Sequence, residues 1–408
     1  MARKALQGVK VIEIAQLVAG PYCAKLLADL GAEVVKIEEP LVGDQARRRE
    51  PFLNDVPHPE RSGLFLYLNT NKLGITLDLK TETGRGIFRK LADWADILIE
   101  DNPPEVLEAL GLDYKNLKAT NPRLIMTSIT PFGQTGPYRN YKAYPLNTFH
   151  AGGESCMMLR MSSTPERAPI KGPGFMGEYD CGLSAATATL CALYARGMTG
   201  SGQYIDISKQ ESAIALERLE NVLYPNRHKE ETRAMINAAA RGAGMVGGLM
   251  RCKDGYIVLA AMQEAEWQGL VDLMGEPAWV NDERFKGESN RSQHAKEATS
   301  LVQEWMMDQT KEEVFRGGQE RGVPIGAVNS PEDLVNSPQL KFRGFFVGID
   351  HPETGKITYP AAPYQFSKTP WAVERPAPLL GQDNEDIYCT LLGYTRQDMV
   401  SMRENGVI

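Results

Sequence analysis

The stretch VKVIEIAQLVAGPYCAKLLADLGAEVVKIEEP, residues 9–40, contains the pattern that decides the fold. Its first seven residues, VKVIEIA, are rich in β-branched side chains, which is typical of a buried strand. The next part, AGPYCAKLLADLGA, has a helical pattern, and EVVKIEEP returns to a strand pattern. A strand, a helix and a second strand in this order predict a βαβ unit with parallel strands.

Strand and helix patterns keep alternating through roughly the first two hundred residues, which is the length of one α/β domain. The further strand patterns are GITLDLK, DILIED, LIMTSITPFG and GQYIDIS. Between the first two of these, TETGRGIFRKLADWA predicts a helix capped by Thr81. The alternation predicts a Rossmann-like α/β domain, residues 1–224, whose parallel sheet is covered by helices on both faces. Ligands of such sheets bind beyond the carboxyl ends of the strands.

The sequence pattern changes after this domain. NAAARGAGMVGGLMRCKDGYIVLAA is rich in glycine and then strand-like, and helical patterns follow it. These features predict a smaller α+β domain over residues 225–325. The tail FRGFFVGIDHPETGKITYPAAPYQF predicts antiparallel strands around a turn.

Composition excludes several classes of protein. The chain has 408 residues and a net charge of −7, whereas a general nucleic-acid binder needs a basic face. Six scattered cysteines without CxxC spacing indicate reduced thiols and a cytoplasmic protein. The sequence shows neither a signal peptide nor an apolar run long enough to span a membrane. The five histidines lack metal-ligand spacing, so we expect no metal.

Two carboxylates, Glu178 and Asp180, lie in GFMGEYDCGL, ahead of the small-residue helix pattern SAATATLCALYAR. A helix N-terminus presents unpaired N–H groups and a partial positive charge, which favour a nearby carboxylate. Asp180 fits a helix cap, whereas Glu178 lies too far ahead of the pattern for a cap. From the residues alone, the two could be nucleophile, cap or surface charge.

A glycine-rich stretch, RGAGMVGGL at residues 241–249, is a second candidate site. Glycines let the backbone approach a ligand closely, and their N–H groups can stabilise an oxyanion. A flexible joint between domains explains the same residues equally well. The candidate glycines are Gly242, Gly244, Gly247 and Gly248.

Together these stretches resemble the family III CoA-transferases, and the resemblance runs nearly end to end. It includes GLSAATATLCALYARGMTGSGQYIDIS, RGVPIGAVNSPEDLVNSPQL and APLLGQDNEDI. The resemblance implies a dimer of interlocked rings, with residues 326–408 returning to complete the large domain. It also implies a reaction in which a carboxylate attacks an acyl-CoA and forms an anhydride and then an enzyme-bound CoA thioester. Coenzyme A is thus a substrate, and no permanently bound cofactor is expected.

The resemblance also assigns residues to the site. Counting back from Gly182, the nucleophilic aspartate of the family falls on Glu178, with Asp180 two positions out of register. The glycine-rich stretch takes the place of the oxyanion loop, and Ala109 replaces an arginine that contacts a CoA phosphate in relatives. The implied CoA contacts are Val18, Ala19, Lys36, Leu77, Asp78, Lys80 and Lys142.

Departures at both Glu178 and Ala109 favour a non-catalytic subunit paired with a homologous active one. The family contains such a pair in the enzyme that transfers CoA from succinyl-CoA to benzylsuccinate during anaerobic aromatic degradation. The alternative is an active homodimer that uses Glu178. An acyl-CoA racemase is a further alternative, but it needs a histidine where this chain has Ala143.

Overall fold

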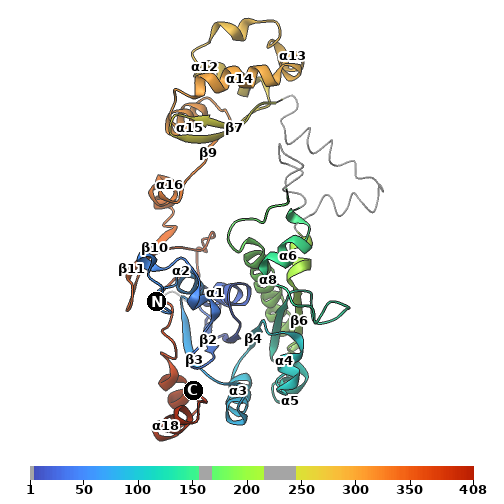
Figure 1. The fold of residues 1–408 in the computed structure, drawn as a ribbon, viewed down its shortest axis with the longest axis vertical. Helices are drawn as coiled ribbons and strands as arrows, with labels where there is room; N and C mark the ends of the chain where they lie inside the picture. Colours follow the sequence, from blue (N-terminus) through green and yellow to red (C-terminus); the bar gives the residue numbers. More distant parts are fainter. Residues whose placement is uncertain (1–3, 156–167, 216–244) are drawn as a thin grey trace. The chain divides into compact units, whose positions relative to one another are not determined.

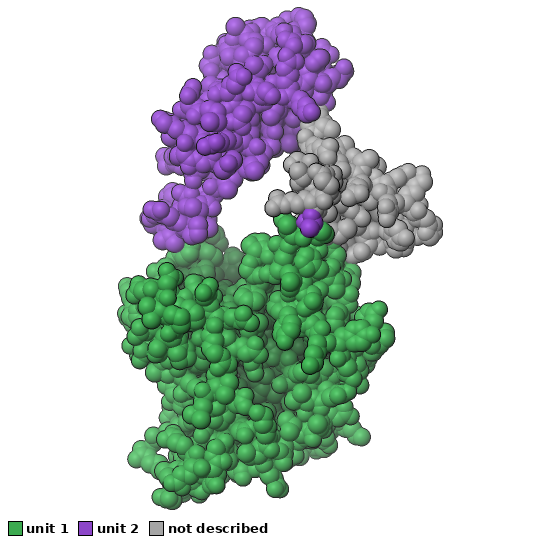
Figure 2. Space-filling view, viewed as in Figure 1, with its two compact units in different colours: residues 1–156, 169–219, 342–408 green, residues 157–168, 220–341 purple. Residues whose placement is uncertain are grey.

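The computed structural model describes residues 4–155, 168–215 and 245–408. The chain divides into two compact units, which Figure 2 distinguishes by colour. The first unit takes the described parts of residues 1–156, 169–219 and 342–408, and the second those of residues 157–168 and 220–341. Segments from both ends of the chain therefore belong to the same unit.

The first unit is built on a sheet of six parallel strands, of which Figure 1 labels β2, β3, β4 and β6. They are β1 (Lys10–Ile14), β2 (Glu33–Glu38), β3 (Lys72–Thr76), β4 (Ile97–Glu100), β5 (Ile125–Thr130) and β6 (Tyr204–Ser208). Their order is β3-β2-β1-β4-β5-β6, so the direction of winding reverses between β1 and β4. This order confirms the Rossmann-like prediction, and it places a ligand crevice beyond the carboxyl ends of β1 and β4.

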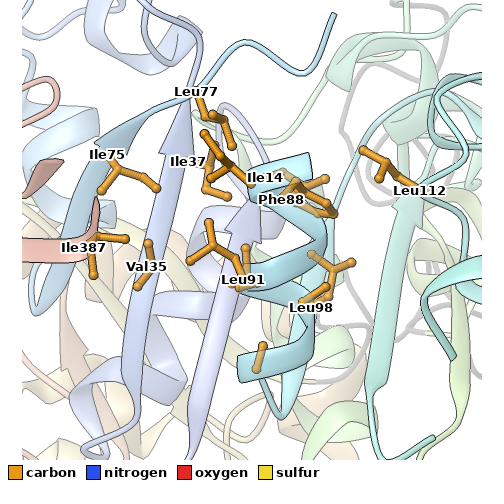
Figure 3. Packing of buried hydrophobic residues seen from close by; sticks show 14 of the residues in the cluster. Ile14, Val35, Ile37, Ile75, Leu77, Phe88, Leu91, Leu98, Leu112 and Ile387 are labelled. Atoms are coloured by element: carbon orange, nitrogen blue, oxygen red, sulfur yellow. The ribbon is translucent and has the colours of Figure 1, made fainter. Parts of the chain in front are cut away.

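Helices cover both faces of this sheet. The α-helices of this unit in the described N-terminal part are α1 (Ala19–Asp29), α2 (Gly63–Leu68), α3 (Glu82–Trp94), α4 (Pro104–Ala109), α5 (Tyr114–Thr120), α6 (Pro145–Ala151), α8 (Met176–Thr199) and α9 (Lys209–Ile214). One core cluster joins α1 and α8 to Val11 of β1, and another joins α3 to Ile12, because successive strand residues point to opposite faces. Figure 3 shows Phe88 and Leu91 of α3 within the second cluster. The Thr81 hydroxyl accepts the Gly84 N–H at 3.0 Å, which confirms the predicted cap.

The C-terminal segment attaches to the edge strand β3 through side chains. Asp383 accepts the N–H of Gly74 at 2.7 Å, and Asn384 accepts that of Thr76 at 2.9 Å. The Tyr388 hydroxyl donates to the Thr76 carbonyl at 2.6 Å. These bonds satisfy backbone groups that an uncovered edge would expose. The same segment includes η4 (Asp386–Leu391) and α18 (Arg396–Glu404), and the predicted hairpin is present as β10 (Phe346–His351) and β11 (Gly355–Pro360).

Buried charges connect the three strands β1, β2 and β3. The Glu13 carboxylate pairs with the Lys36 ammonium at 2.8 Å and with the Lys72 ammonium at 2.7 Å, and all three side chains are fully buried. Lys36 also pairs with Asp44 at 2.8 Å. Burial alone would raise the pKa of the Asp44 carboxyl, but Lys36 and two backbone N–H groups lower it overall. Stabilisation by Asp44 is therefore present above the ordinary carboxyl pKa and is lost as pH falls through the lowered value.

The second unit is α+β, as predicted. Its antiparallel strands are β7 (Val246–Cys252), β8 (Gly255–Ala261) and β9 (Ile325–Ala327), in the order β7-β8-β9. Its helices are α12 (Glu264–Leu273), α13 (Gly287–Gln293), α14 (Ala295–Met306), α15 (Lys311–Glu320), α16 (Pro331–Asn336) and α17 (Pro338–Phe342). Because β9 pairs with β8, the unit continues beyond residue 325 and ends at Lys341. Among the described residues, no helix is both long and apolar enough to cross a membrane.

We predict that Glu13→Gln lowers the free energy of unfolding by about 3–5 kcal/mol, because it leaves two buried ammonium groups without their shared carboxylate. Urea denaturation measures the change. The matched control is Glu374→Gln, which removes an exposed partner of Lys4 and should cost about 0–1 kcal/mol. Equal effects of the two substitutions would contradict a structural role for the buried network.

Candidate active site

The loop after β1 lies at the crevice and is held by the buried charges. Lys36 donates to the carbonyl of Ala15 at 2.9 Å, and Asp44 accepts the N–H of Leu17 at 2.9 Å. Leu17 has a left-handed backbone, with φ of +66°. An L-residue rarely adopts this conformation unless its surroundings impose it, so these contacts fix the loop in one shape.

Asp101, which directly follows β4, holds the middle of the same loop. Its two carboxylate oxygens accept the N–H of Gln16 at 3.0 and 3.1 Å. Burial raises the pKa of Asp101 well above its usual range, although Lys209 and the Gln16 N–H act in the opposite direction. The carboxyl ends of β1 and β4 are thus joined across the crevice.

Glu178 and Lys209 form an ion pair near the carboxyl end of β6. Glu178 lies in the first turn of α8 and is 3% exposed. Lys209 is the first residue of α9 and directly follows β6, and its Nζ is 2.7 Å from Oε2 of Glu178. Burial alone would lower the pKa of Lys209, but Glu178 and Asp101 raise it overall. Lys209 is therefore held as a cation by two carboxylates.

Asp180 does not cap the helix, so that prediction is wrong. Helix α8 begins at Met176, with Phe175 at the cap position, and Asp180 lies inside it. The small-residue pattern that suggested a later start covers only part of the helix. Burial raises the pKa of Asp180. Within the described ranges, its carboxylate makes no hydrogen bond or ion pair.

The expected CoA contacts fall into two groups. Val18, Ala19 and Lys36 are fully buried. The Lys36 ammonium is engaged by Glu13 and Asp44, so this geometry does not present it to a phosphate. Lys142 is exposed in the segment before α6, and its ammonium contacts no partner in the part of the chain that the structure describes.

The second group of expected CoA contacts follows the carboxyl end of β3 and consists of Leu77, Asp78 and Lys80. They line a cavity of about 180 Å³ with Gln16 and with residues of α4, the helix that ends at Ala109. Lys80 is exposed and pairs with Glu39 at 2.6 Å. A larger cavity, about 560 Å³, is lined by residues of α4, α5 and the strands β4, β5 and β6, and its lining includes neither Glu178 nor Lys209.

Half of the glycine-rich stretch is a strand rather than a loop. Gly247 and Gly248 lie in β7, where both have positive φ angles, +129° and +107°. The Gly247 N–H donates to Thr299 at 3.2 Å, so this donor is already used. Gly242 and Gly244 lie outside the described residues. The expectation of a continuous loop is therefore corrected for residues 246–249.

Three residues of the site had no role in the sequence interpretation: Lys209, Asp101 and Gln16. Each directly follows a strand pattern or lies within two residues of its end. In a parallel sheet these positions converge on one edge, so strand ends supplied a usable signal for them.

We predict that Glu178→Ala destabilises the protein by about 1–3 kcal/mol, because it leaves the half-buried Lys209 with one carboxylate fewer. Asp180→Ala should change the stability by no more than about 0.5 kcal/mol, since it removes no bonded group. Urea denaturation of both variants tests this difference. A larger loss for Asp180→Ala would show that Asp180 supports the helix start after all.

Comparison with known proteins agrees with this architecture. Residues 6–384 match the model of CoA-transferase family III. Succinyl-CoA–D-citramalate CoA-transferase of Chloroflexus aurantiacus is 31% identical, over 99% of this chain and 98% of that protein. Formyl-CoA:oxalate CoA-transferase of Rhodopseudomonas palustris is 30% identical, over 99% and 97%.

Solved structures show the same similarity. A CAIB/BAIF family protein from Brucella suis has a TM-score of 0.83 and 29% identity, covering 95% of this chain and 100% of that one. A protein of Mycobacterium tuberculosis has a TM-score of 0.76 and 27% identity, covering 94% and 99%. The family match spans nearly the whole sequence, so the chain belongs to CoA-transferase family III.

Proposed function

We propose that this chain is the non-catalytic subunit of a CoA-transferase that moves CoA from a succinyl-CoA-like donor to a dicarboxylic acid. A homologous sister subunit supplies the reacting carboxylate. The observation that carries this proposal is the ion pair between the buried Glu178, the expected position of the family nucleophile, and the half-buried Lys209.

The ion pair opposes nucleophilic attack by Glu178. A carboxylate attacks a thioester through an oxygen lone pair, and the Lys209 ammonium already engages Oε2 at 2.7 Å. The Glu178 side chain is 3% exposed, so water does not compensate for breaking this contact. Separating charges in such a place costs several kcal/mol, by about the amount measured for broken buried pairs.

Lys209 also makes an acyl intermediate on Glu178 unproductive. Acylation removes the charge of Glu178, so Lys209 loses the larger of the two influences that raise its pKa. The CoA thiolate released by acylation can take a proton from Lys209, and the resulting amine lies next to the anhydride and attacks its acyl carbon. A C–N bond forms, the C–O bond to Glu178 breaks, and the proton from nitrogen goes to the released carboxylate. The product is an amide on Lys209, which cannot pass the acyl group onward.

The substrates follow from chemistry shared by the relatives. One relative is named for succinyl-CoA and D-citramalate, and another for formyl-CoA and oxalate. Citramalate and oxalate are dicarboxylic acids, and so is benzylsuccinate, which we propose as a candidate acceptor. A dicarboxylate offers one carboxyl group to receive CoA and a second one for recognition.

One observation favours the alternative of an active chain. Glu178 lies in the first turn of α8, where the unpaired N–H groups of a helix stabilise a carboxylate. A homodimer that used Glu178 would need Lys209 to move aside during turnover.

We predict that the native protein, purified with Glu178→Ala in this chain, keeps most of its CoA transfer from succinyl-CoA. After incubation with succinyl-CoA, peptide mapping should find no hydroxylamine-sensitive adduct on Glu178 in the unmodified protein. In Lys209→Met the competing amine is absent, so such an adduct should become detectable. Abolished turnover in a folded Glu178→Ala protein would establish the active alternative.

We further predict that the native protein contains two different chains, interlocked through their homologous domains. Native mass spectrometry of the complex purified from its source should give one mass for this chain and another for a chain of similar length. A complex of this chain alone, with full activity, would contradict a non-catalytic role.

A further inference from the structure

A second cavity, about 480 Å³, adjoins the loop after β1. Its lining residues are Gln16, Glu39, Val42, Gly43, Gln45, Arg48 and Arg49. It shares Gln16 and Glu39 with the 180 Å³ cavity that contains Leu77 to Lys80. The two cavities are therefore neighbours at the carboxyl ends of β1 to β3.

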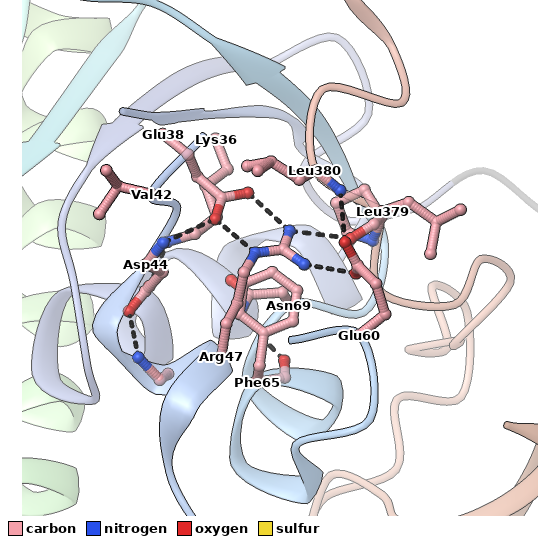
Figure 4. A network of polar contacts seen from close by, with 12 residues as sticks. Lys36, Glu38, Val42, Asp44, Arg47, Glu60, Phe65, Asn69, Leu379 and Leu380 are labelled. Carbon is pink, nitrogen blue, oxygen red and sulfur yellow. Dashed lines mark hydrogen bonds and ion pairs between the residues drawn. The ribbon is translucent and has the colours of Figure 1, made fainter. Parts of the chain in front are cut away.

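Two arginines of the sequence ARRR, Arg48 and Arg49, line this cavity. The short helix η1 (Gln45–Arg48) begins after Asp44, whose side chain accepts the N–H of Ala46. Arg47 points inward, where its guanidinium bonds to Glu38 at 2.7 Å and lies 3.7 Å from the ring of Phe65 (Figure 4). A 3₁₀ helix has about three residues per turn, so neighbouring side chains point in different directions. Arg48 and Arg49 are accordingly exposed.

The two exposed guanidinium groups have little to neutralise them. Arg48 donates one hydrogen bond, to the carbonyl of Val42 at 2.9 Å. The Arg49 guanidinium has no hydrogen-bond or ion-pair partner among the described residues. Glu39, the acidic residue of the lining, is already paired with Lys80. The cavity thus presents two planar cations, each with several N–H donors whose geometry matches carboxylate and phosphate oxygens.

We propose that Arg48 and Arg49 bind an anionic oxygen group of a substrate, either a phosphate of CoA or a carboxylate of the acid. They supply the cation that is missing at Ala109, and they are specificity-determining residues of this chain. The inference rests on the proposed function only for the identity of the substrates. It does not depend on whether Glu178 reacts.

The test is calorimetric titration of the protein as purified with CoA, with 3′-dephospho-CoA and with succinate. The variant is Arg48→Gln with Arg49→Gln. The control is Arg343→Gln with Arg403→Gln, which changes the net charge equally at two exposed arginines of the same unit. We expect the first variant to weaken binding of one ligand by about 10-fold or more, and the control to leave it unchanged.

The ligand that loses affinity identifies the group that is bound. Weaker binding of CoA but not of succinate assigns the arginines to a phosphate. If 3′-dephospho-CoA already binds the unmodified protein as weakly as CoA binds the variant, that phosphate is the 3′ group. Weaker binding of succinate alone assigns them to the acid. Unchanged affinity for all three ligands, or an equal loss in the control, would overturn the proposal.

Failure of this test is distinct from failure of the proposed function. The titration measures binding, whereas the role of Glu178 is decided by turnover and labelling. Both arginines are exposed, so the folded state should survive their substitution, and a circular-dichroism melt of the variant verifies this. An active Glu178 would leave the binding result as it stands.

Discussion

One buried carboxylate connects the core of the large unit with its crevice. Glu13 holds Lys36 and Lys72 from the two neighbouring strands, and all three side chains are fully buried. Lys36 reaches Asp44 and the carbonyl of Ala15, and Asp44 holds the N–H of Leu17. Buried charges are costly unless every member is paired, so this network forms as a whole or not at all. The shape of the crevice loop is therefore set by electrostatics inside the sheet and not by the loop residues themselves.

The loop after β1 also contacts the candidate site. Gln16 offers its N–H to Asp101, and Asp101 together with Glu178 raises the pKa of Lys209. The site consequently contains one cation, Lys209, which pairs with Glu178 and whose charged form Asp101 also favours. A nucleophile needs a free lone pair, and a general base needs an available proton site. The ion pair between Glu178 and Lys209 is the contact on which we base the proposal that Glu178 does not react.

Much of the large unit could be predicted from the sequence, because its signals are local. The strand and helix periods of residues 9–40 and the cap at Thr81 depend on neighbours in the sequence, and both appear in the structure. The contacts that the sequence did not reveal depend on distant partners. Lys36 is an expected CoA contact, and its ion pairs with Glu13 and Asp44 were not foreseen. Glu178 and Lys209 are 31 positions apart in the sequence. The length of α8 and the order of the strands bring them into contact.

Binding and reactivity use different groups of the same crevice, so one can persist without the other. In our proposal, the ion pair with Lys209 holds back the reactivity of Glu178. Binding requires cations facing a cavity, and Arg48 and Arg49 supply them. Gln16 belongs to both parts, because it lines the cavity and its N–H is bonded to Asp101. An anion bound at the two arginines therefore lies against the loop that positions Asp101.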